Sequence, residues 1–214
     1  TTQIRRLLGI RRIIRHNDID AVVSFLTRVN LAVIVATRGL ALPVVIGECT
    51  YPPKTEQTFT VKTLTKLLYP LATKVVMQTA QGLAWLSSYC PRSQGLYIAN
   101  PVTYPIPPRP GRIEPGHIVQ EGERILLAVG RFHRAKGFDL LLAAFAQLVT
   151  EFPQWRLVIL GDGELRNELE VQRAQLGIAD KALLPGAAGN VSEWYESADL
   201  AVLSSRYEGF PNAL

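Results

Sequence analysis

Two cations and a glycine follow one apolar run in the second half of the chain. The run covers residues 124–129 (RILLAV), and residues 130–137 (GRFHRAKG) come directly after it. Gly130 permits a tight turn, and Arg131 and Lys136 place positive charge near the amino end of the next expected helix. Fixed cations beside a positive helix end suit a phosphate or a diphosphate. Taken alone, the loop also fits a solvated basic surface.

A glycine-rich turn follows the next strand-like run. Residues 161–164 are Gly-Asp-Gly-Glu, and a dinucleotide-binding fingerprint would need a third glycine at position 166. Arg166 stands there instead, which excludes the dehydrogenase interpretation. Gly163 would still allow a ligand to approach the backbone closely, although an ordinary turn has the same pattern.

A carboxylate precedes a glycine and an expected helix start in a third loop, residues 204–212 (SSRYEGFPN). Glu208 could accept hydrogen bonds from sugar hydroxyls, and the backbone N–H groups after it could face an anion. A glutamate that only caps the helix is the alternative. Because ligands of open parallel sheets bind outside the carboxyl ends of the strands, we expect these loops to line one cleft.

The elements that position these loops are short apolar runs alternating with helical patterns. We expect strands at 21–26, 42–47, 74–78, 96–99, 124–129, 156–160, 182–184 and 199–203. We expect helices at 29–38, 58–69, 80–88, 138–151, 164–176 and 192–197, besides one at the start of the chain. This alternation predicts the α/β class, with parallel sheets covered by helices on both faces.

A proline-dense segment separates the two halves of the chain. Residues 100–122 contain six prolines and few apolar residues, which excludes a helix interior or a central strand. We therefore expect a partial N-terminal domain over 1–99, a semi-rigid linker over 100–122 and a partial C-terminal domain over 123–214. Both ends look cut, because the first helix has no strand before it and Pro211 starts a helix that is not completed. We expect a fragment of a longer protein.

The net charge of +5 comes from one segment. Five arginines fall within the first sixteen residues, which hold no acid, and the remaining 23 − 5 = 18 basic residues balance 18 acidic ones. A neutral body argues against nucleic acid as a partner. A helix over 4–15 would place Arg5, Arg11, Arg12 and Arg15 on one side. That side is either a solvated face of a packed helix or a contact with anionic lipid headgroups.

Three further observations narrow the class of protein. The most apolar stretch, residues 31–47, is too short and too interrupted to span a bilayer. The three histidines lie far apart without metal-ligand spacing, so no metal site is expected. The two cysteines form no disulfide framework, which makes the cytoplasm the default location.

The ordered set of loops resembles the C-terminal half of the family 4 (group 1) glycosyltransferases of GT-B fold. The family pattern is Val-Gly-Arg at a strand end, then Lys-Gly, then Gly-Asp-Gly, then Ser-x-x-Glu-Gly-Phe-Pro. All four occur in this order between Val129 and Pro211. Residues 24–30 and 43–48 are similar to the acceptor domain of capsule and exopolysaccharide transferases, and residues 98–102 to the interdomain connection. The resemblance implies two Rossmann-like, doubly wound domains.

The same resemblance implies roles for individual residues. Arg131 and Lys136 would bind the donor diphosphate and stabilise its charge as it leaves, and Glu208 would hold the hydroxyls of the donor sugar. The remaining donor-binding positions would be Gly130, Gly163, Gly209, Phe210 and Asn212. The implied reaction is a retaining transfer, without a bound metal or other cofactor, from a UDP-linked sugar to a glycan or polyprenyl-linked acceptor. The enzyme would be cytoplasmic and peripheral at the inner membrane face.

Departures from the family pattern keep other functions open. The second glutamate of the family's motif would fall at position 216, beyond the last residue, and the glycine-rich loop before the first helix is absent. Where many relatives carry a histidine, Glu48-Cys49-Thr50 stand, and Glu48 could face the acceptor. A binding module for nucleotide-sugars without catalysis and a nucleotide-sugar epimerase are the alternatives.

Overall fold

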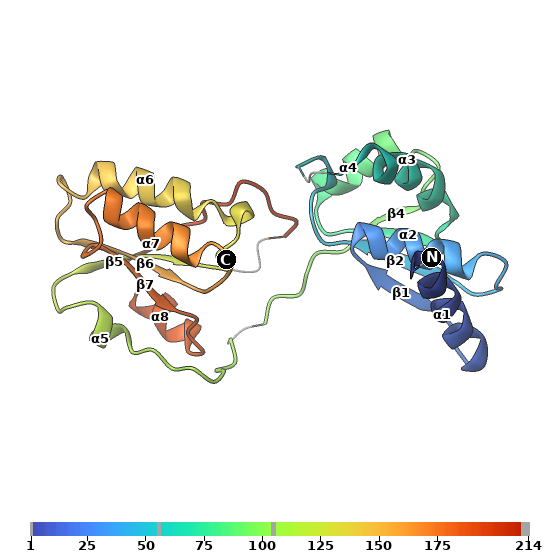
Figure 1. The fold of residues 1–214 in the computed structure, drawn as a ribbon. Helices are drawn as coiled ribbons and strands as arrows, with labels where there is room; N and C mark the ends of the chain where they lie inside the picture. Colours follow the sequence, from blue (N-terminus) through green and yellow to red (C-terminus); the bar gives the residue numbers. More distant parts are fainter. Residues whose placement is uncertain (1, 55–56, 104–105, 211–214) are drawn as a thin grey trace. The chain divides into compact units, whose positions relative to one another are not determined.

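The computed structural model describes residues 2–54, 57–103 and 106–210. Its contacts divide the chain into two units, shown in Figure 1. The first contains the described residues up to Pro101 together with residues 208–210, and the second contains those from Val102 to Tyr207. The helix expected to start at Pro211 lies outside the described residues.

The first unit is built around a parallel sheet of β1 (Val22–Phe25), β2 (Val44–Glu48), β3 (Lys74–Met77) and β4 (Gly95–Tyr97), in that order. Its helices are α1 (Thr2–His16), α2 (Thr27–Thr37), α3 (Phe59–Leu68) and α4 (Ala80–Tyr89), with 3-10 turns at Pro52–Lys54 and Tyr69–Leu71. The predicted strand and helix positions are confirmed to within a few residues. Thr58 and Thr79 cap α3 and α4 with their side-chain oxygens, as a threonine at this position favours.

One buried cluster joins the helices of this unit to its sheet. Ile34 of α2, Ile46 of β2, Val75 of β3 and Leu86 of α4 are all buried in it. The side chains of Val23 and Phe25 are 60% and 55% exposed. In the described residues β1 is thus less covered than the expected sheet with helices on both faces.

Helix α1 contacts α2, and one arginine of α1 forms hydrogen bonds across that contact. Arg11 Nη1 donates to the carbonyl oxygens of Ala36 (2.8 Å) and Arg38 (2.7 Å), where the last turn of α2 leaves carbonyls without helical partners. Arg11 therefore does not belong to a purely solvated arginine face. The apolar side chain of Ile13 on the same helix is 63% exposed. Among the described residues, no helix is both long enough and apolar enough to cross a membrane.

The second unit has a parallel sheet in the order β7 (Ala182–Gly186), β6 (Trp155–Leu160), β5 (Arg124–Val129) and β8 (Leu200–Ala201). The helices are α5 (Pro115–Ile118), α6 (Phe138–Leu148), α7 (Arg166–Gln175) and α8 (Val191–Ser197), with a 3-10 turn at Arg134–Lys136. In Figure 1, α6 and α7 lie on one side of this sheet and α5 and α8 on the other. This is the doubly wound arrangement that the alternation predicts.

Alternate residues of β6 explain why both faces of this sheet are covered. Leu157 and Ile159 are buried in the cluster of α6 and α7, whereas Val158 and Leu160 are buried with Trp194 of α8. Successive side chains of a strand point to opposite faces, so an unbroken apolar run is what a doubly covered strand requires. Trp194 is fully buried, and its ring N–H donates to the carbonyl of Ile113 at 2.9 Å.

We expected residues 100–122 to be a linker between the units. Much of this segment instead packs on the second unit. The side chain of Asn190 bonds both backbone groups of Ile113, with distances of 3.0 Å. The N–H of Arg109 donates to the carbonyl of Gly189 at 2.9 Å. Its prolines keep this segment out of helix interiors and central strands, and the short helix α5 begins at one of them, Pro115. The other backbone groups of the segment can pair with a neighbouring loop.

Candidate functional site

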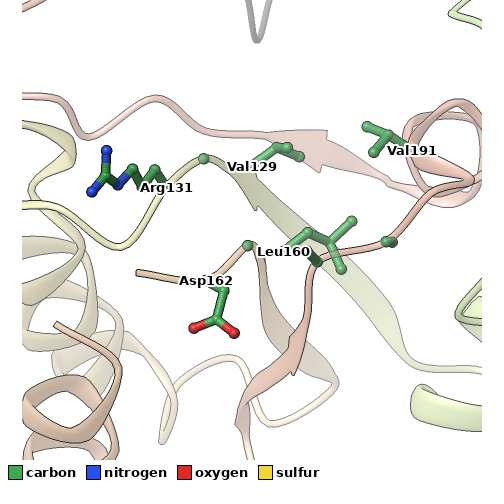
Figure 2. A pocket seen from close by; sticks show the side chains of 9 residues that line it. Val129, Arg131, Leu160, Asp162 and Val191 are labelled. Atoms are coloured by element: carbon green, nitrogen blue, oxygen red, sulfur yellow. The ribbon is translucent and has the colours of Figure 1, made fainter. Parts of the chain in front are cut away.

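A pocket of about 260 Å³ lies at the carboxyl ends of β5, β6 and β7. Its walls come from the loops after β5 and β6, from Ala187 and Ala188 after β7, and from Val191 at the start of α8. Figure 2 shows Arg131 and Asp162 on adjacent loops and Leu160 and Val191 on the other side of the hollow. The lining is mostly apolar and backbone, with charged groups at one side, which is typical of a small-molecule site.

Arg131 lines this pocket, and most of its side chain is exposed to solvent. Its side chain is 72% exposed, and Nη2 donates to Glu164 Oε2 at 3.1 Å. Glu164 also faces His133, with 3.5 Å between Oε1 and Nε2. A hydrogen bond from its own backbone N–H, and then the nearby positive charges of Arg131 and His133, lower the pKa of Glu164. Glu164 is thus an anionic partner that an incoming phosphate would have to replace at Arg131.

Lys136 lies on the 3-10 turn before α6, beside Gly130. A Cβ atom on Gly130 would lie 3.3 Å from the Cε atom of Lys136 and 3.3 Å from the ring of Phe138. Gly130 is not among the glycines with positive φ, so the expected tight turn is not what requires a glycine here. Its small size instead lets the Lys136 side chain pack against the loop that lines the pocket.

In the loop after β6, Gly161 and Gly163 leave room for the backbone of the neighbouring loop. A Cβ atom on Gly161 would lie 1.8 Å from the carbonyl oxygen of Gly130, and the φ angle of Gly161 is 146°. A Cβ atom on Gly163 would lie 2.5 Å from the carbonyl oxygen of Phe132. The close approach that these glycines permit is therefore between the loops after β5 and β6. The predicted approach of a donor to Gly163 stays a prediction.

Sequence reasoning missed part of the pocket wall. Asp162 and Val191 line the pocket, as do Ala187 and Ala188. The available signal was the small-residue run 186–189 (GAAG), one residue after the strand predicted at 182–184. Small residues after a parallel strand leave space at the edge where ligands bind.

The described residues predicted in the third loop, Glu208 to Phe210, group with the first unit, whereas the pocket is lined by residues of the second. By its contacts Glu208 groups with the first unit, whereas Arg131 and Lys136 lie in the second. Glu208, Gly209 and Phe210 are each half-buried. A Cβ atom on Gly209 would lie 1.9 Å from the carbonyl oxygen of Cys49, so this glycine allows close backbone packing in the first unit. Asn212 lies outside the described residues.

Glu48, the predicted acceptor-side residue, ends β2 inside a hydrogen-bonded cluster. It is 2% exposed. Thr27 Oγ1 donates to Oε2 at 2.9 Å, Asn30 Nδ2 donates to Oε1 at 3.3 Å, and the hydroxyl of Tyr69 also donates to Oε1. The carboxyl group is therefore turned toward these side chains, and the expected contact of Glu48 with an acceptor stays a prediction.

The electrostatics of this cluster follow from its burial. Burial raises the pKa of Glu48, and the hydrogen bonds from Tyr69, Thr27 and Asn30 offset only part of that effect. Burial and then the adjacent carboxylate raise the pKa of the Tyr69 hydroxyl. Among the described residues, no group of three or more His, Cys, Asp or Glu side chains is placed to hold a metal ion.

Comparisons with known proteins show which sequences and folds this chain resembles. Residues 112–214 match the family model described as glycosyl transferases group 1. One similar protein is the N-acetylgalactosamine-N,N'-diacetylbacillosaminyl-diphospho-undecaprenol 4-alpha-N-acetylgalactosaminyltransferase of Campylobacter jejuni. It is 29% identical over 97% of this chain. The chain spans 57% of the length of that relative.

Solved structures show the same fold. Sucrose-phosphate synthase from Thermosynechococcus elongatus superposes with a TM-score of 0.83 at 18% identity, over 98% of this chain and 56% of that one. Anabaena Alr3699/HepE, solved with UDP and glucose, superposes with a TM-score of 0.71 at 15% identity, over 97% of this chain and 58% of that one. The predicted class, two α/β units with parallel sheets as in GT-B proteins, is confirmed.

Proposed function

We propose that this chain, whose residues 112–214 belong to the group 1 glycosyl transferase family, is part of an enzyme that moves a sugar from a nucleotide-sugar to an acceptor. The observation that carries the proposal is the pocket at the carboxyl ends of β5, β6 and β7, with Arg131 at one side. A nucleoside has an apolar base and a polar ribose, which suit a wall of small residues and backbone groups. Its diphosphate suits the cations of the loop after β5.

The donor is a UDP-sugar in this proposal. Its diphosphate would contact Arg131 and Lys136, which would stabilise the negative charge that develops as UDP leaves. For Arg131 this requires an exchange of partners, because its guanidinium now pairs with Glu164. In the proposed transfer these two cations take the place of a bound metal at the leaving group, and the resemblance to the family 4 glycosyltransferases implies a retaining outcome. The structure of HepE with UDP and glucose supports UDP as the first nucleotide to test.

The acceptor is a glycan or a polyprenyl-linked sugar, and α1 is the proposed membrane contact. Arg5, Arg12 and Arg15 are exposed on α1, next to Ile4 and Leu8, which are 62% and 60% exposed. Basic and apolar side chains on one helix face suit anionic headgroups, at roughly 1 kcal/mol for each charge near the surface. The enzyme would then work at the cytoplasmic face of the membrane. The acceptor in the name of the C. jejuni relative, a diphospho-undecaprenol, supports this choice.

The decisive experiment on the transfer is Glu208→Gln in the whole protein. Loss of the carboxylate that would hold the sugar should lower product formation by about a hundredfold or more, while UDP binding stays within about twofold. Glu121→Gln is the matched control, because Glu121 is exposed in a turn before β5, at the opposite end of that strand from the pocket. Unchanged turnover of the Glu208 variant would refute the assigned role.

The same assays separate the alternatives. Calorimetry that finds UDP binding, together with no product from any acceptor, would indicate a binding module without catalysis. Release of UDP without an acceptor would indicate an epimerase. For the membrane contact, replacing Arg5, Arg12 and Arg15 by glutamine should abolish sedimentation with vesicles containing phosphatidylglycerol. Sedimentation that is unaffected by these changes, or by added salt, would contradict the proposal.

A further inference from the structure

Arg166 begins α7 at the position where a dinucleotide fingerprint would have its third glycine. It does not line the pocket, and its side chain is 27% exposed. Nε donates to Asp162 Oδ1 at 2.9 Å, and Nη2 donates to the carbonyl of Gly161 at 3.2 Å. Nη1 donates to the carbonyl of Leu184 on β7 at 3.3 Å. One guanidinium therefore bonds the loop after β6 to the neighbouring strand.

The same guanidinium also reaches the loop after β5. Its central carbon lies 5.1 Å from the centre of the Phe132 ring, and Phe132 is fully buried. Phe132 is the residue next to Arg131, and its N–H donates to the carbonyl of Asp162 at 2.8 Å. The N–H of Leu165 donates back to the carbonyl of Phe132 at 3.1 Å. The two loops that line the pocket thus form one layer, and Arg166 packs against both.

Charge adds to this packing. The hydrogen bond from Arg166, followed by one from the Gly163 N–H, lowers the pKa of Asp162, so this carboxylate stays charged beside the pocket. Asp162 Oδ1 accepts both of these bonds, at 2.9 Å from Arg166 Nε and 2.8 Å from the Gly163 nitrogen. Its orientation in the pocket wall is therefore set by Arg166 and by its own turn.

We propose that Arg166 is a positioning residue for the nucleotide pocket, one that holds the loops of Arg131 and Asp162 in a single preformed arrangement. This inference rests on the proposed function for its ligand, a nucleoside diphosphate. A preformed loop loses less conformational freedom when the ligand binds, so the effect of Arg166 falls on affinity as well as on stability. Arg166 itself touches no ligand in this account.

Arg173 provides a matched control on the same helix. Its side chain is 23% exposed and, like that of Arg166, pairs with Glu170. Its Nη1 donates to the carbonyls of Ala179 (3.3 Å) and Ala182 (2.9 Å). Ala182 is the first residue of β7, at the end of the sheet away from the pocket. Arg166→Leu removes four side-chain hydrogen bonds and Arg173→Leu removes two, and only the bonds of Arg166 lie beside the pocket loops.

The experiment measures UDP affinity by calorimetry and the Tm of the same samples, in the whole protein. Both leucine variants should lower the Tm. Only Arg166→Leu should raise the Kd for UDP, by about tenfold or more, while Arg173→Leu stays within about twofold. Arg166→Lys, which keeps a cation for Asp162, should recover part of the affinity. Equal Kd changes in the two leucine variants, or none in Arg166→Leu, would overturn the inference.

A second measurement keeps the inference independent of the proposed function. Failure of the wild-type protein to bind UDP would count against the proposed donor, not against the role of Arg166. Amide hydrogen exchange then reports on the loops directly, because the N–H of Phe132 bonds across to Asp162. Exchange at Phe132 and Leu165 should accelerate in Arg166→Leu and not in Arg173→Leu. Unchanged exchange in both variants would refute a positioning role.

Discussion

At the carboxyl end of β5 the second unit has Gly130 and the exposed Arg131, whereas at the carboxyl end of β2 the first unit has Glu48, which is 2% exposed. Both positions lie at the carboxyl end of a parallel strand, in sheets of the same class. At this edge of the second unit, Arg131 pairs with Glu164 while both side chains are exposed. The carboxyl group of the first unit is enclosed by Tyr69, Thr27 and Asn30.

The difference shows two uses of the same edge of a sheet. Exposed ion pairs contribute little to stability, so Arg131 can exchange Glu164 for a ligand at small cost. A buried carboxyl group is stabilising only while its donors stay in place, which makes Glu48 a structural link between segments. Asn30 extends this link, because it donates to the Gly47 carbonyl at 3.0 Å and accepts from Ser24 at 2.8 Å. An open edge suits binding and a closed edge suits stability.

The largest effect is expected where the backbones of the second unit meet. Gly161→Ala would bring a Cβ atom to within 1.8 Å of the Gly130 carbonyl oxygen at a φ of 146°. Backbone strain and overpacking together should lower the free energy of unfolding by about 4 kcal/mol. Urea denaturation of the second unit measures this loss.

Gly177→Ala is the control for that substitution. Gly177 has a φ of 68°, and nothing lies within 4 Å of its Cβ position. Only the left-handed backbone then opposes alanine, and the expected loss is about 1 kcal/mol. Equal losses in the free energy of unfolding for the two variants would show that the close contact between Gly161 and Gly130 does not contribute to stability.

The next largest effect is expected at the closed edge of the first unit. Glu48→Leu would leave the hydroxyl of Tyr69 and the side-chain amide of Asn30 buried without their acceptor, and should cost about 3 kcal/mol. Glu48→Gln keeps an oxygen for these donors and should cost less than about 1 kcal/mol. Thermal unfolding at pH 5 compares the two variants, and a glutamine variant as unstable as the leucine variant would contradict the account.

The pH dependence sharpens the same comparison. Burial raises the pKa of Glu48 above its ordinary value of 4.5, so the folded state binds this proton more tightly than the unfolded state. The contribution of Glu48 is therefore complete below the ordinary pKa and is lost as the pH rises through the raised one. The stability of the wild type minus that of Glu48→Gln should fall with rising pH, and a rise would refute a raised pKa for the buried carboxyl group.

The smallest effect on stability is expected at Asp139 in the second unit. Its contribution to stability should be lost as the pH falls, whereas that of Glu48 is lost as the pH rises. Arg206 donates to both of its carboxylate oxygens, at 2.6 and 2.5 Å, and this lowers the pKa of Asp139. The Asp139 side chain is 42% exposed, so Asp139→Asn should cost only about 0.5 kcal/mol. The contribution is present above the ordinary pKa of 3.8 and is lost as the pH falls through the lowered one.

Denaturation at pH 7 and at pH 3 measures the Asp139 effect. Glu151→Gln, at an exposed glutamate in the turn after α6, controls for the change of net charge. An Asp139 variant that behaves like the Glu151 variant at both pH values would show that the pair with Arg206 contributes nothing.

Local pattern was enough to predict most elements of the fold. The limits of β5 are confirmed at both ends, because six consecutive apolar or aliphatic-stemmed residues between turn signals leave one interpretation. The last strand, expected over 199–203, is only Leu200–Ala201. Strand length depends on how far the neighbouring strand offers hydrogen bonds, and here β8 pairs with only part of β5. Periodicity within one segment does not contain that information.

For individual charged residues, too, the sequence predicted some positions and not others. Arg131 was predicted at the pocket and lies there, because a parallel strand delivers the next residue to its carboxyl edge. Arg11 was predicted on an arginine face that meets either solvent or lipid headgroups, and instead it donates to carbonyls at the end of α2. A helical wheel places side chains on faces but does not say which face meets another helix.

The sequence by itself determined that this chain forms two α/β units and which loops carry glycines and charges, since both follow from local residue types and spacing. Only the tertiary structure decided what the charges do. Whether a carboxylate stays in water, as Asp162 does, or is buried among donors, as Glu48 is, depends on side chains distant in the sequence. The same holds for Arg166, whose partners come from three segments that meet only when the sheet has formed.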